Sequence, residues 1–147
     1  ACHHTQTSAY CFAYAEKELL SFLKENGYKV ALATATPPQR AERYLKAHDL
    51  YKYFDVTVSA SMVSVGKPAP DIYLKAAEML GLSPQNCVAL EDSPNGIKSA
   101  SSAGCVTVMV PDLDKPSNDI IPLLHGVADG LSDVKRILRE LEDCNIQ

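Results

Sequence analysis

The sequence predicts an α/β protein, a Rossmann-like three-layer sandwich with a mostly parallel sheet. Short apolar runs alternate with longer segments whose apolar residues recur at helical spacing. The apolar runs lack the polar alternation of a half-exposed strand, so both of their faces are expected to be buried. Buried strands that alternate with helices are typical of a parallel sheet with helices on both faces.

Each predicted element has its own signal. Apolar runs predict strands at 30–33, 56–59, 87–90 and 105–110, with a short strand at 127–129. Helical spacing predicts helices at 16–26, from Pro37 to His48, at 70–80, at 94–103 and over the region from Val134 to Leu141. A glycine follows three of these helices, and glycine readily adopts the left-handed conformation that ends a helix.

Two of the helices carry more specific expectations. Ser93 is expected to cap the helix that begins at Pro94. In the second helix the apolar stripe contains Ala41, Tyr44, Leu45 and His48, so we expect all four on its inner face. His48 is therefore interpreted as a partly buried packing residue and not as a catalyst.

Composition limits the functions that need to be considered. The 147 residues suit one domain, and 46% hydrophobic and 22% charged residues are ordinary for a globular protein. A net charge of −4 without a basic stripe argues against nucleic acid or a membrane surface as a partner. The odd, unpatterned set of five cysteines indicates free thiols and a reducing, cytoplasmic compartment. Residues 1–15 are expected to be an irregular segment or a surrogate strand, and residues 16–147 a core domain.

Functional side chains follow three of the predicted strands, where an open parallel sheet collects its ligands. The first group is Thr34 and Ala35, a hydroxyl and a backbone N–H suited to phosphate oxygens; the alternative is that Thr34 or Thr36 only caps the next helix. The second is Lys67, which is held beside Pro68 and offers a point charge to a phosphoryl group.

The third group is the acid pair Glu91 and Asp92, which ends an apolar strand. Two adjacent carboxylates are costly to hold together unless a cation is present. Mg²⁺ binds through one or two carboxylates together with substrate oxygens, so these acids predict a magnesium site. The alternative is two solvated loop acids, which the buried strand before them disfavours.

These segments, in this order, resemble the haloacid dehalogenase (HAD) superfamily, in its phosphatase and β-phosphoglucomutase-like branch. Residues 31–36 (ALATAT), 66–73 (GKPAPDIY) and 90–97 (LEDSPNGI) are similar to the second, third and fourth motifs of that family. The resemblance implies that Thr34 and the Ala35 N–H hold phosphoryl oxygens and that Lys67 neutralises the phosphoryl charge. It also implies that Glu91 and Asp92 bind Mg²⁺ and that Ser93 and Asn95 shape the rim of the metal loop.

The sequence departs from the family at its first motif. The family's Asp-x-Asp supplies a nucleophile and an acid/base, but no aspartate precedes Asp49 here, and the usual cap domain has no counterpart. Asp112 and Asp114 have the Asp-x-Asp spacing but lie in a polar loop after the predicted strand at 105–110, and we interpret them as solvated. We expect the segment 8–15, with its alternating aromatic residues, to fill the empty central position of the sheet. A centre left open would instead favour self-association.

The sequence therefore predicts the core of a Mg²⁺-dependent phosphatase or phosphomutase. Its substrate would be a small phosphorylated metabolite, such as a sugar phosphate. Because the nucleophilic aspartate is absent, we expect this chain to be inactive. The alternatives are a non-catalytic phosphate- or metal-binding regulatory domain and a purely structural fragment.

Overall fold

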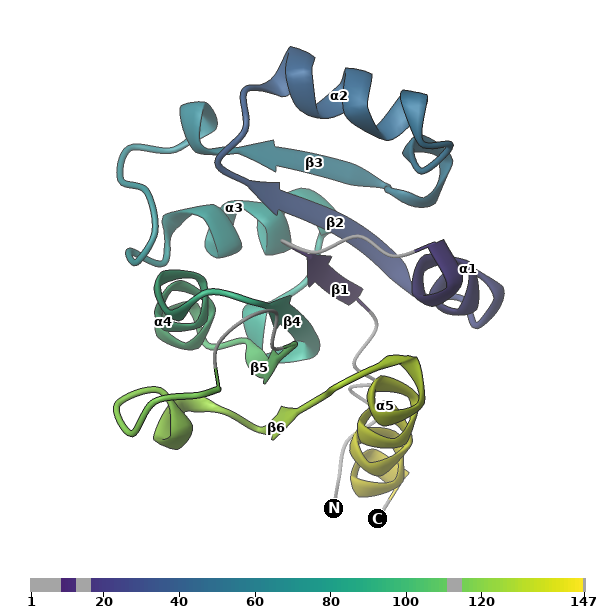
Figure 1. Cartoon of the computed structure of the whole chain (residues 1–147), viewed down its shortest axis with the longest axis vertical. Coiled ribbons are helices and arrows are strands. Elements are labelled where there is room, and N and C mark those ends of the chain that lie inside the picture. The colour runs from purple at the N-terminus through teal and green to yellow at the C-terminus, as the bar shows by residue number, and fades with distance from the viewer. Residues whose placement is uncertain (1–8, 13–16, 111–114, 147) are drawn as a thin grey trace.

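A computed structural model describes residues 9–12, 17–110 and 115–146 of the chain. The described strands form one sheet in the order β3-β2-β1-β4-β5-β6, and each neighbouring pair is parallel (Figure 1). The strands are β1 (Ala9–Phe12), β2 (Lys29–Thr34), β3 (Val56–Ser59), β4 (Cys87–Glu91), β5 (Val106–Met109) and β6 (Gly126–Val127). The predicted α/β class with a parallel sheet is confirmed.

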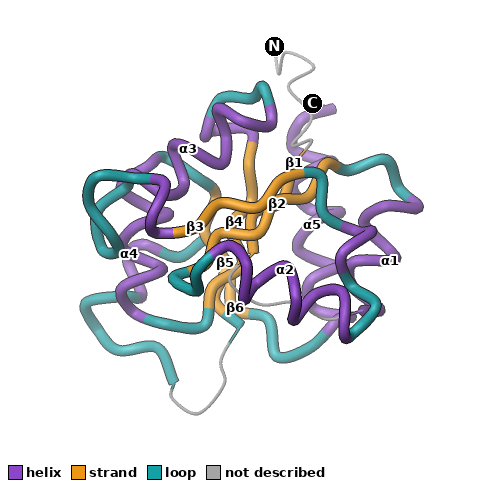
Figure 2. The backbone as a smooth tube through the Cα atoms, turned by 90° about the horizontal axis from the view of Figure 1, so that it is seen from above, coloured by secondary structure: helices purple, strands orange, loops and turns teal. Residues whose placement is uncertain are grey.

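Helices cover both faces of the sheet, which gives the three predicted layers (Figure 2). The α-helices are α1 (Lys17–Glu25), α2 (Pro38–Ala47), α3 (Asp71–Leu80), α4 (Pro94–Ala103) and α5 (Leu131–Ile146). Short 3₁₀ helices are η1 (Tyr51–Tyr53), η2 (Ala60–Met62), η3 (Pro84–Asn86) and η4 (Ile121–Leu123). Helices α1 and α5 pack on one face of the sheet, and α3 and α4 pack on the other.

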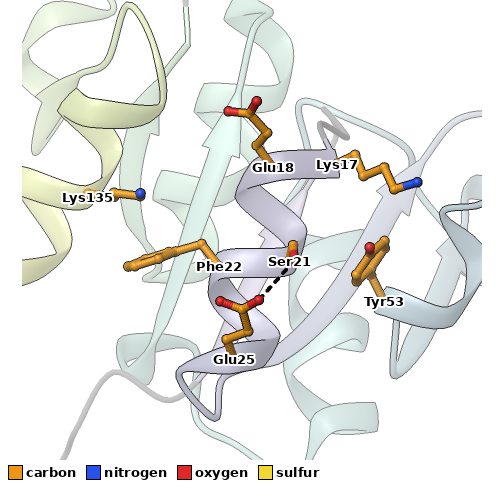
Figure 3. Close-up of a pocket in the computed structure, with 7 residues that line it drawn as sticks. All are labelled: Lys17, Glu18, Ser21, Phe22, Glu25, Tyr53 and Lys135. Atoms are coloured by element: carbon orange, nitrogen blue, oxygen red, sulfur yellow. Dashed lines mark hydrogen bonds between the residues drawn. The ribbon is translucent and has the colours of Figure 1, made fainter.

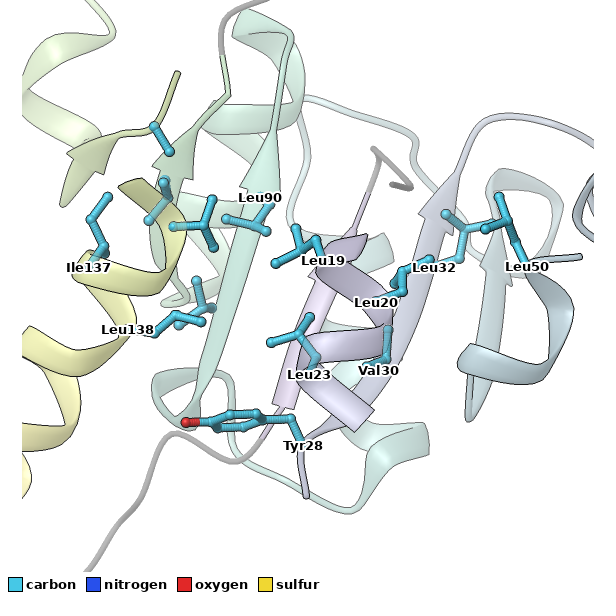
Figure 4. Close-up of a cluster of buried hydrophobic side chains, with 14 of the residues drawn as sticks. Leu19, Leu20, Leu23, Tyr28, Val30, Leu32, Leu50, Leu90, Ile137 and Leu138 are labelled. Carbon is cyan, nitrogen blue, oxygen red and sulfur yellow. The ribbon is translucent and has the colours of Figure 1, made fainter. Parts of the chain in front are cut away.

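Alternation along each strand divides the core between the two faces. In β2, Val30 and Leu32 pack with α1, whereas Ala31 and Ala33 pack with α3. The α1 face carries large side chains, with leucines and an isoleucine from α1 and α5 meeting those of β2 and β4 (Figure 4). The α3 face is lined largely by alanines, so α3 and α4 can lie close to the strands.

The first described strand, β1, lies in the middle of the sheet. Phe12 is paired with Leu32 of β2 on one side and with Leu90 of β4 on the other. These four residues fall inside the segment 8–15 for which a strand was expected, although residues 8 and 13–15 lie outside the described residues. In the described part of the chain the sheet has no open central position, so that reason for expecting self-association does not apply.

The predicted helix ends agree with the structure at several positions. The Ser93 hydroxyl accepts a hydrogen bond from the Gly96 N–H at 3.1 Å, which confirms the predicted cap of α4. Gly81 and Gly104 end α3 and α4 with φ of 74° and 95°, in the left-handed region that glycine tolerates. No helix among residues 9–12, 17–110 and 115–146 has the length and apolarity to cross a bilayer.

The prediction for the inner face of α2 is wrong at two of its four residues. Ala41 and Leu45 are buried, but His48 is exposed and Tyr44 is 54% exposed. Helix α2 contacts β3, an edge strand, and η1, so it needs only a narrow apolar stripe. His48 follows the last helical residue, where its ring stacks on the Tyr44 ring with centroids 4.1 Å apart.

Two cysteines belong to the core on the α3 face. Cys87 and Cys105 are both buried. Burial, with a smaller contribution from the neighbouring Cys87, raises the pKa of the Cys105 thiol to about 12. At neutral pH this thiol is therefore protonated and behaves as a small apolar side chain.

Candidate active site

The candidate site lies at the carboxyl edge of the sheet, beside its central strand. The chain runs outward from β1 through β2 to β3, and then returns to the other side of β1 with β4. The gap between β1 and β4 is therefore the point at which the strand order reverses. Parallel α/β sheets bind ligands at the strand ends next to such a point. The arrowheads of β1, β2 and β3 point to this edge in Figure 1.

Glu91 reaches the site because it is the last residue of β4. Side chains of a strand alternate between faces, so Glu91 lies with Cys87 and Ala89 on the face covered by α3 and α4. Its side chain is fully buried, at 0% exposure. A buried carboxylate is costly unless it is paired and hydrogen-bonded, so its partners determine what this position can do.

The first partner of Glu91 is Lys67. Its ammonium lies 2.6 Å from Oε1 of Glu91, and its side chain is 17% exposed. The same ammonium donates to the carbonyl of Ala33 in β2 at 3.4 Å. Because β1 lies between β2 and β4, Lys67 connects the two strands that flank the central strand. This position places a positive charge at the carboxyl edge of the sheet.

The second partner is Tyr73, in the first turn of α3. Its hydroxyl donates a short hydrogen bond to Oε1 of Glu91, the oxygen that also pairs with Lys67. Both donors therefore use one oxygen. Among the described residues, Oε2 of Glu91 is the buried side-chain oxygen that has no hydrogen-bond partner.

Gly96, in the first turn of α4, covers the other side of the carboxylate. A Cβ atom at this position would lie far inside van der Waals contact of Oε2 and Cδ of Glu91. The glycine is therefore required by the close approach of the helix backbone to the carboxylate, not by a left-handed conformation. Only a residue without a side chain fits between α4 and Glu91.

Thr34 and Thr36 form a turn after β2. The Thr34 hydroxyl accepts a hydrogen bond from the Thr36 N–H at 3.1 Å. The buried hydroxyl of Ser59, at the end of β3, donates to the Thr36 carbonyl at 2.9 Å and holds this turn in place. Neither threonine caps α2, whose N-cap residue is Pro37 and has no side-chain cap bond. The capping alternative for these threonines is therefore wrong.

The loop that carries Lys67 is also held by buried polar groups. Ser99, in α4, is fully buried and donates to the Ala69 carbonyl at 2.6 Å. The Val65 N–H donates to Asp71 at 3.2 Å, and the Ala69 N–H donates to the Gly66 carbonyl at 3.0 Å. These bonds fix both sides of Lys67, so that its long side chain starts from a defined backbone position.

The remaining predicted site residues lie at the same edge, just after β2 and β4 and in the first turn of α4. Asp92 is half-buried directly after Glu91, and within the described ranges it makes no ion pair. Ala35 is exposed in the turn between β2 and α2, and Asn95 is exposed as the second residue of α4. Among residues 17–110, no hydrogen bond joins Thr34 to Lys67 or Glu91. The structure thus brings Lys67 and Glu91 into direct contact. Thr34 and Asp92 lie at the same edge of the sheet, and each keeps hydrogen-bonding capacity that a ligand could use.

A surface pocket of about 670 Å³ lies elsewhere, along the outer side of α1 (Figure 3). It is lined by Lys17, Glu18, Ser21, Phe22, Glu25, Tyr53 and Lys135. None of the predicted site residues lines it. Its lysines and glutamates are mixed in sign, so it offers no concentrated charge to a phosphorylated ligand.

Comparison with known proteins connects this arrangement to a family. The family model for haloacid dehalogenase-like hydrolases matches residues 6–104, a span that includes β1, Lys67 and Glu91. The chain belongs to the haloacid dehalogenase-like hydrolase family. The predicted HAD resemblance is therefore confirmed, and the matched span ends at Gly104, just after α4.

Individual HAD proteins are similar over most of this chain. A phosphorylated carbohydrates phosphatase of Thermotoga maritima is 39% identical over 122 residues, which are 83% of this chain and 49% of that protein. Hexitol phosphatase B of Escherichia coli is 40% identical over 95 residues, 65% of this chain and 43% of that protein. The crystal structure of β-phosphoglucomutase from Clostridium difficile superposes with a TM-score of 0.70 at 26% identity, covering 86% of this chain and 56% of that one. The chain thus spans about half the length of these HAD relatives.

Two residues of this candidate site were not predicted from sequence. Tyr73 gave no polar signal, because it lies among the apolar positions of α3. Gly96 did carry a signal, since a glycine inside a helix is unfavourable without a packing reason. The pair Asp112 and Asp114 lies outside the described residues, so its interpretation as a solvated loop stays a prediction.

Proposed function

We propose that this chain forms the phosphoryl- and magnesium-binding core of a HAD phosphatase or phosphomutase. The observation that carries the proposal is the buried pair of Lys67 and Glu91 at the edge of the central strand. A lysine and a carboxylate held together at a strand-order reversal are suited to a phosphoryl group and its metal ion.

Lys67, Thr34 and Ala35 would bind the phosphoryl group. The Lys67 ammonium has its position set by Glu91 and the Ala33 carbonyl, so little side-chain freedom is lost when it meets an anion. Thr34 ends β2 and Ala35 follows it, so a hydroxyl and a backbone N–H lie at the carboxyl edge of the sheet. Positive charge and preset donors would stabilise the negative charge that develops during phosphoryl transfer.

Glu91 and Asp92 would hold Mg²⁺. The donor set fits the ion in part, because Asp92 is half-buried at this edge, whereas Oε2 of Glu91 has no hydrogen-bond partner but is covered by the Gly96 backbone. The described residues contain no group of three His, Cys, Asp or Glu side chains that could hold a metal ion, so waters and substrate oxygens would have to complete the coordination of Mg²⁺. When bound, Mg²⁺ would supply positive charge to the phosphoryl oxygens. Ser93 and Asn95 would shape the rim of this loop, with Ser93 capping α4.

The proposed substrate is a small phosphorylated metabolite, such as a sugar phosphate. The names of the Thermotoga maritima and Escherichia coli relatives refer to phosphorylated carbohydrates and to hexitols. Sequence identity of 39% and 40% to these proteins supports the same substrate class here. The proposed compartment is reducing and cytoplasmic, as the odd, unpatterned set of five cysteines predicts.

We further propose that these 147 residues alone do not turn over a phosphoester. Residues 1–48 contain no aspartate, and the position after Phe12 in the sequence is Ala13. Without a carboxylate nucleophile next to Lys67, the site would bind phosphate and metal without forming a covalent intermediate. This favours a non-catalytic phosphate- or metal-binding domain as the second candidate function.

The deciding experiment measures hydrolysis of para-nitrophenyl phosphate by the chain, with and without Mg²⁺, beside Asp92→Ala. Calorimetry with Mg²⁺ and with inorganic phosphate accompanies it. We expect binding of both ligands, loss of Mg²⁺ binding in the variant, and no hydrolysis above the variant. Mg²⁺-dependent hydrolysis that the variant lacks would overturn the proposed inactivity and support an enzyme. Failure to bind either ligand would leave only a structural role.

A further inference from the structure

Both oxygens of the Glu91 carboxylate are closed to a further ligand. Oε1 accepts hydrogen bonds from the Lys67 ammonium, at 2.6 Å, and from the Tyr73 hydroxyl. Oε2 has no hydrogen-bond partner among the described residues, but it is buried and the backbone of Gly96 lies against it. A Mg²⁺ ion bound to this carboxylate would need an open position about 2.1 Å from one of the oxygens. Neither oxygen offers such a position.

The neighbouring acid, Asp92, has different surroundings. It follows the last residue of β4, so its side chain begins beyond the strand, at the carboxyl edge of the sheet. It is half-buried, and within the described ranges it makes no ion pair. Of the two adjacent acids, Asp92 is therefore the one that a hydrated cation can reach from solvent.

The contacts of Lys67 indicate what the buried carboxylate does instead. An ammonium group has three N–H donors. Lys67 uses one of them on Oε1 of Glu91, at 2.6 Å, and another on the Ala33 carbonyl, at 3.4 Å. The centre of the Tyr73 ring lies 5.3 Å from the same ammonium and closes a further side. Among the residues that the structure describes, these contacts leave one donor of the partly exposed Lys67 for a ligand.

We propose that Glu91 is a positioning residue for the phosphoryl-binding Lys67 and is not a ligand of Mg²⁺. Glu91 and the Ala33 carbonyl hold the ammonium in place, so that its remaining donor is left for a phosphoryl oxygen. Asp92 then meets the cation without help from Glu91. This inference rests on the proposed phosphoryl and magnesium sites, and it narrows the acids that would hold the ion from two to one.

Binding of a cation by Glu91 would require one of two rearrangements. If Lys67 left Oε1, a buried charge-assisted hydrogen bond would be lost and the phosphoryl site would lose its placed cation. If α4 moved away from Oε2, the hydrogen bond from Ser99 to the Ala69 carbonyl, which supports the Lys67 loop, would be disturbed. Either change would give up part of the phosphoryl site in order to complete the metal site.

A charge-balanced double variant tests this division of roles. Lys67→Met combined with Glu91→Gln removes one positive and one negative charge, so the net charge near Asp92 is unchanged. A single substitution of Glu91 would be less decisive, since the loss of a nearby negative charge weakens cation binding even without direct contact. In the double variant we expect the affinity for Mg²⁺ to stay within about threefold of the wild type. The affinity for inorganic phosphate should fall by about 10–100-fold, because its charged donor is removed.

Three further variants make the result decisive. Asp92→Asn should lose Mg²⁺ binding. Lys75→Met with Glu78→Gln is the matched control, because it removes a surface pair on α3 whose charged atoms lie 4.0 Å apart, and it should bind both ligands like the wild type. Lys67→Gln with Glu91→Gln, in which two amides can bond to each other, replaces the first double variant if that one does not fold. Titration calorimetry gives both affinities, and circular dichroism checks the fold.

The possible outcomes separate this inference from the proposed function. Loss of Mg²⁺ binding in the folded double variant would overturn the inference and leave the proposed magnesium site of Glu91 and Asp92 standing. Unchanged phosphate affinity in the double variant would show that Lys67 does not bind phosphate, and would overturn the positioning role of Glu91 with it. A wild-type chain that binds neither Mg²⁺ nor phosphate would overturn the proposed function itself.

Discussion

Lys67 and Glu91 form an ion pair in which Nζ of Lys67 lies 2.6 Å from Oε1 of Glu91. Lys67 lies in the short loop before α3, and Glu91 is the last residue of β4. The carboxylate is fully buried and the lysine is 17% exposed, so solvent screens the pair little. The pair thus serves two purposes in the fold. It satisfies a buried negative charge, and it fixes a cation at the edge where a phosphorylated ligand would arrive.

Removing Lys67 should therefore destabilise the protein. Lys67→Met leaves Glu91 buried without its counter-charge, a change that typically costs about 3–5 kcal/mol. Urea unfolding should show this loss, and adding Glu91→Gln to the same chain should recover a large part of it. Lys75→Met is the control, because Lys75 only approaches Glu78 at 4.0 Å on the surface of α3. A loss below about 1 kcal/mol for Lys67→Met, the size expected of a surface pair, would contradict the structure.

Gly96→Ala should also be destabilising, although alanine favours a helix over glycine by about 1 kcal/mol. The added methyl group meets the Glu91 carboxylate at an impossible distance, so the carboxylate or α4 must move. Overpacking of this kind commonly costs about 1–3 kcal/mol, which outweighs the gain in helix propensity. Thermal or urea unfolding measures the net change. Gly66→Ala is the control, since a Cβ atom there meets nothing within 4 Å. A more stable Gly96→Ala variant would show that Glu91 does not lie under α4.

Ser99→Ala should weaken the support of the Lys67 loop. The substitution removes the 2.6 Å hydrogen bond to the Ala69 carbonyl in a fully buried place. An unsatisfied buried carbonyl costs about 1–3 kcal/mol. Ser102→Ala, at an exposed position of the same helix, should change the unfolding free energy by less than about 0.5 kcal/mol. If both variants unfold at the same denaturant concentration as the wild type, the bond contributes nothing to stability.

Asp55 should make stability fall at low pH. Partial burial acts to raise its pKa, but the Val30 N–H and the Lys24 ammonium, at 2.8 and 2.9 Å, outweigh burial and lower the pKa below 3.8. A carboxyl group with a lowered pKa stabilises the fold above its ordinary pKa, and this contribution is lost as pH falls through the folded value. Asp55→Asn should therefore flatten the decline of the unfolding midpoint below about pH 4 and leave its slope near neutrality unchanged. An unchanged acid limb in the variant would exclude Asp55 as a source of the decline.

Hydrophobic periodicity, together with the residues that begin and end helices, was enough to predict most of the architecture. The four main strands after residue 28 and all five α-helices follow from apolar spacing, and Ser93 and Gly104 mark the ends of α4 as expected. The position of Tyr44 and His48 could not be predicted, because spacing shows which residues share a helix face but not how much of that face the sheet covers. An edge strand covers less of α2 than the periodic pattern suggests.

The site was predictable only as far as its charged residues. Lys67 and Glu91 could be assigned to one edge of the sheet, because the positions of the strand ends and the order of the motifs place both residues there. Their direct contact, and the choice of one carboxylate oxygen by Lys67 and Tyr73, depend on side-chain directions that arise from the packing of α3 and α4. A buried tyrosine hydroxyl in an apolar helix face leaves no trace in hydrophobic periodicity.

The central place of β1 also has a consequence for the order of folding. The pairs Ala9–Lys29 and Ala9–Cys87 show that this four-residue strand takes partners near and far along the chain. The described sheet has no ladder between β2 and β4, so its two halves share hydrogen bonds only through β1. The nearer pairing can form while the chain is still being synthesised, whereas the farther one must wait for β4. We therefore expect closure of the sheet to be a late, long-range event, which brings the end of β4, with Glu91, beside β1 only after β2 has paired.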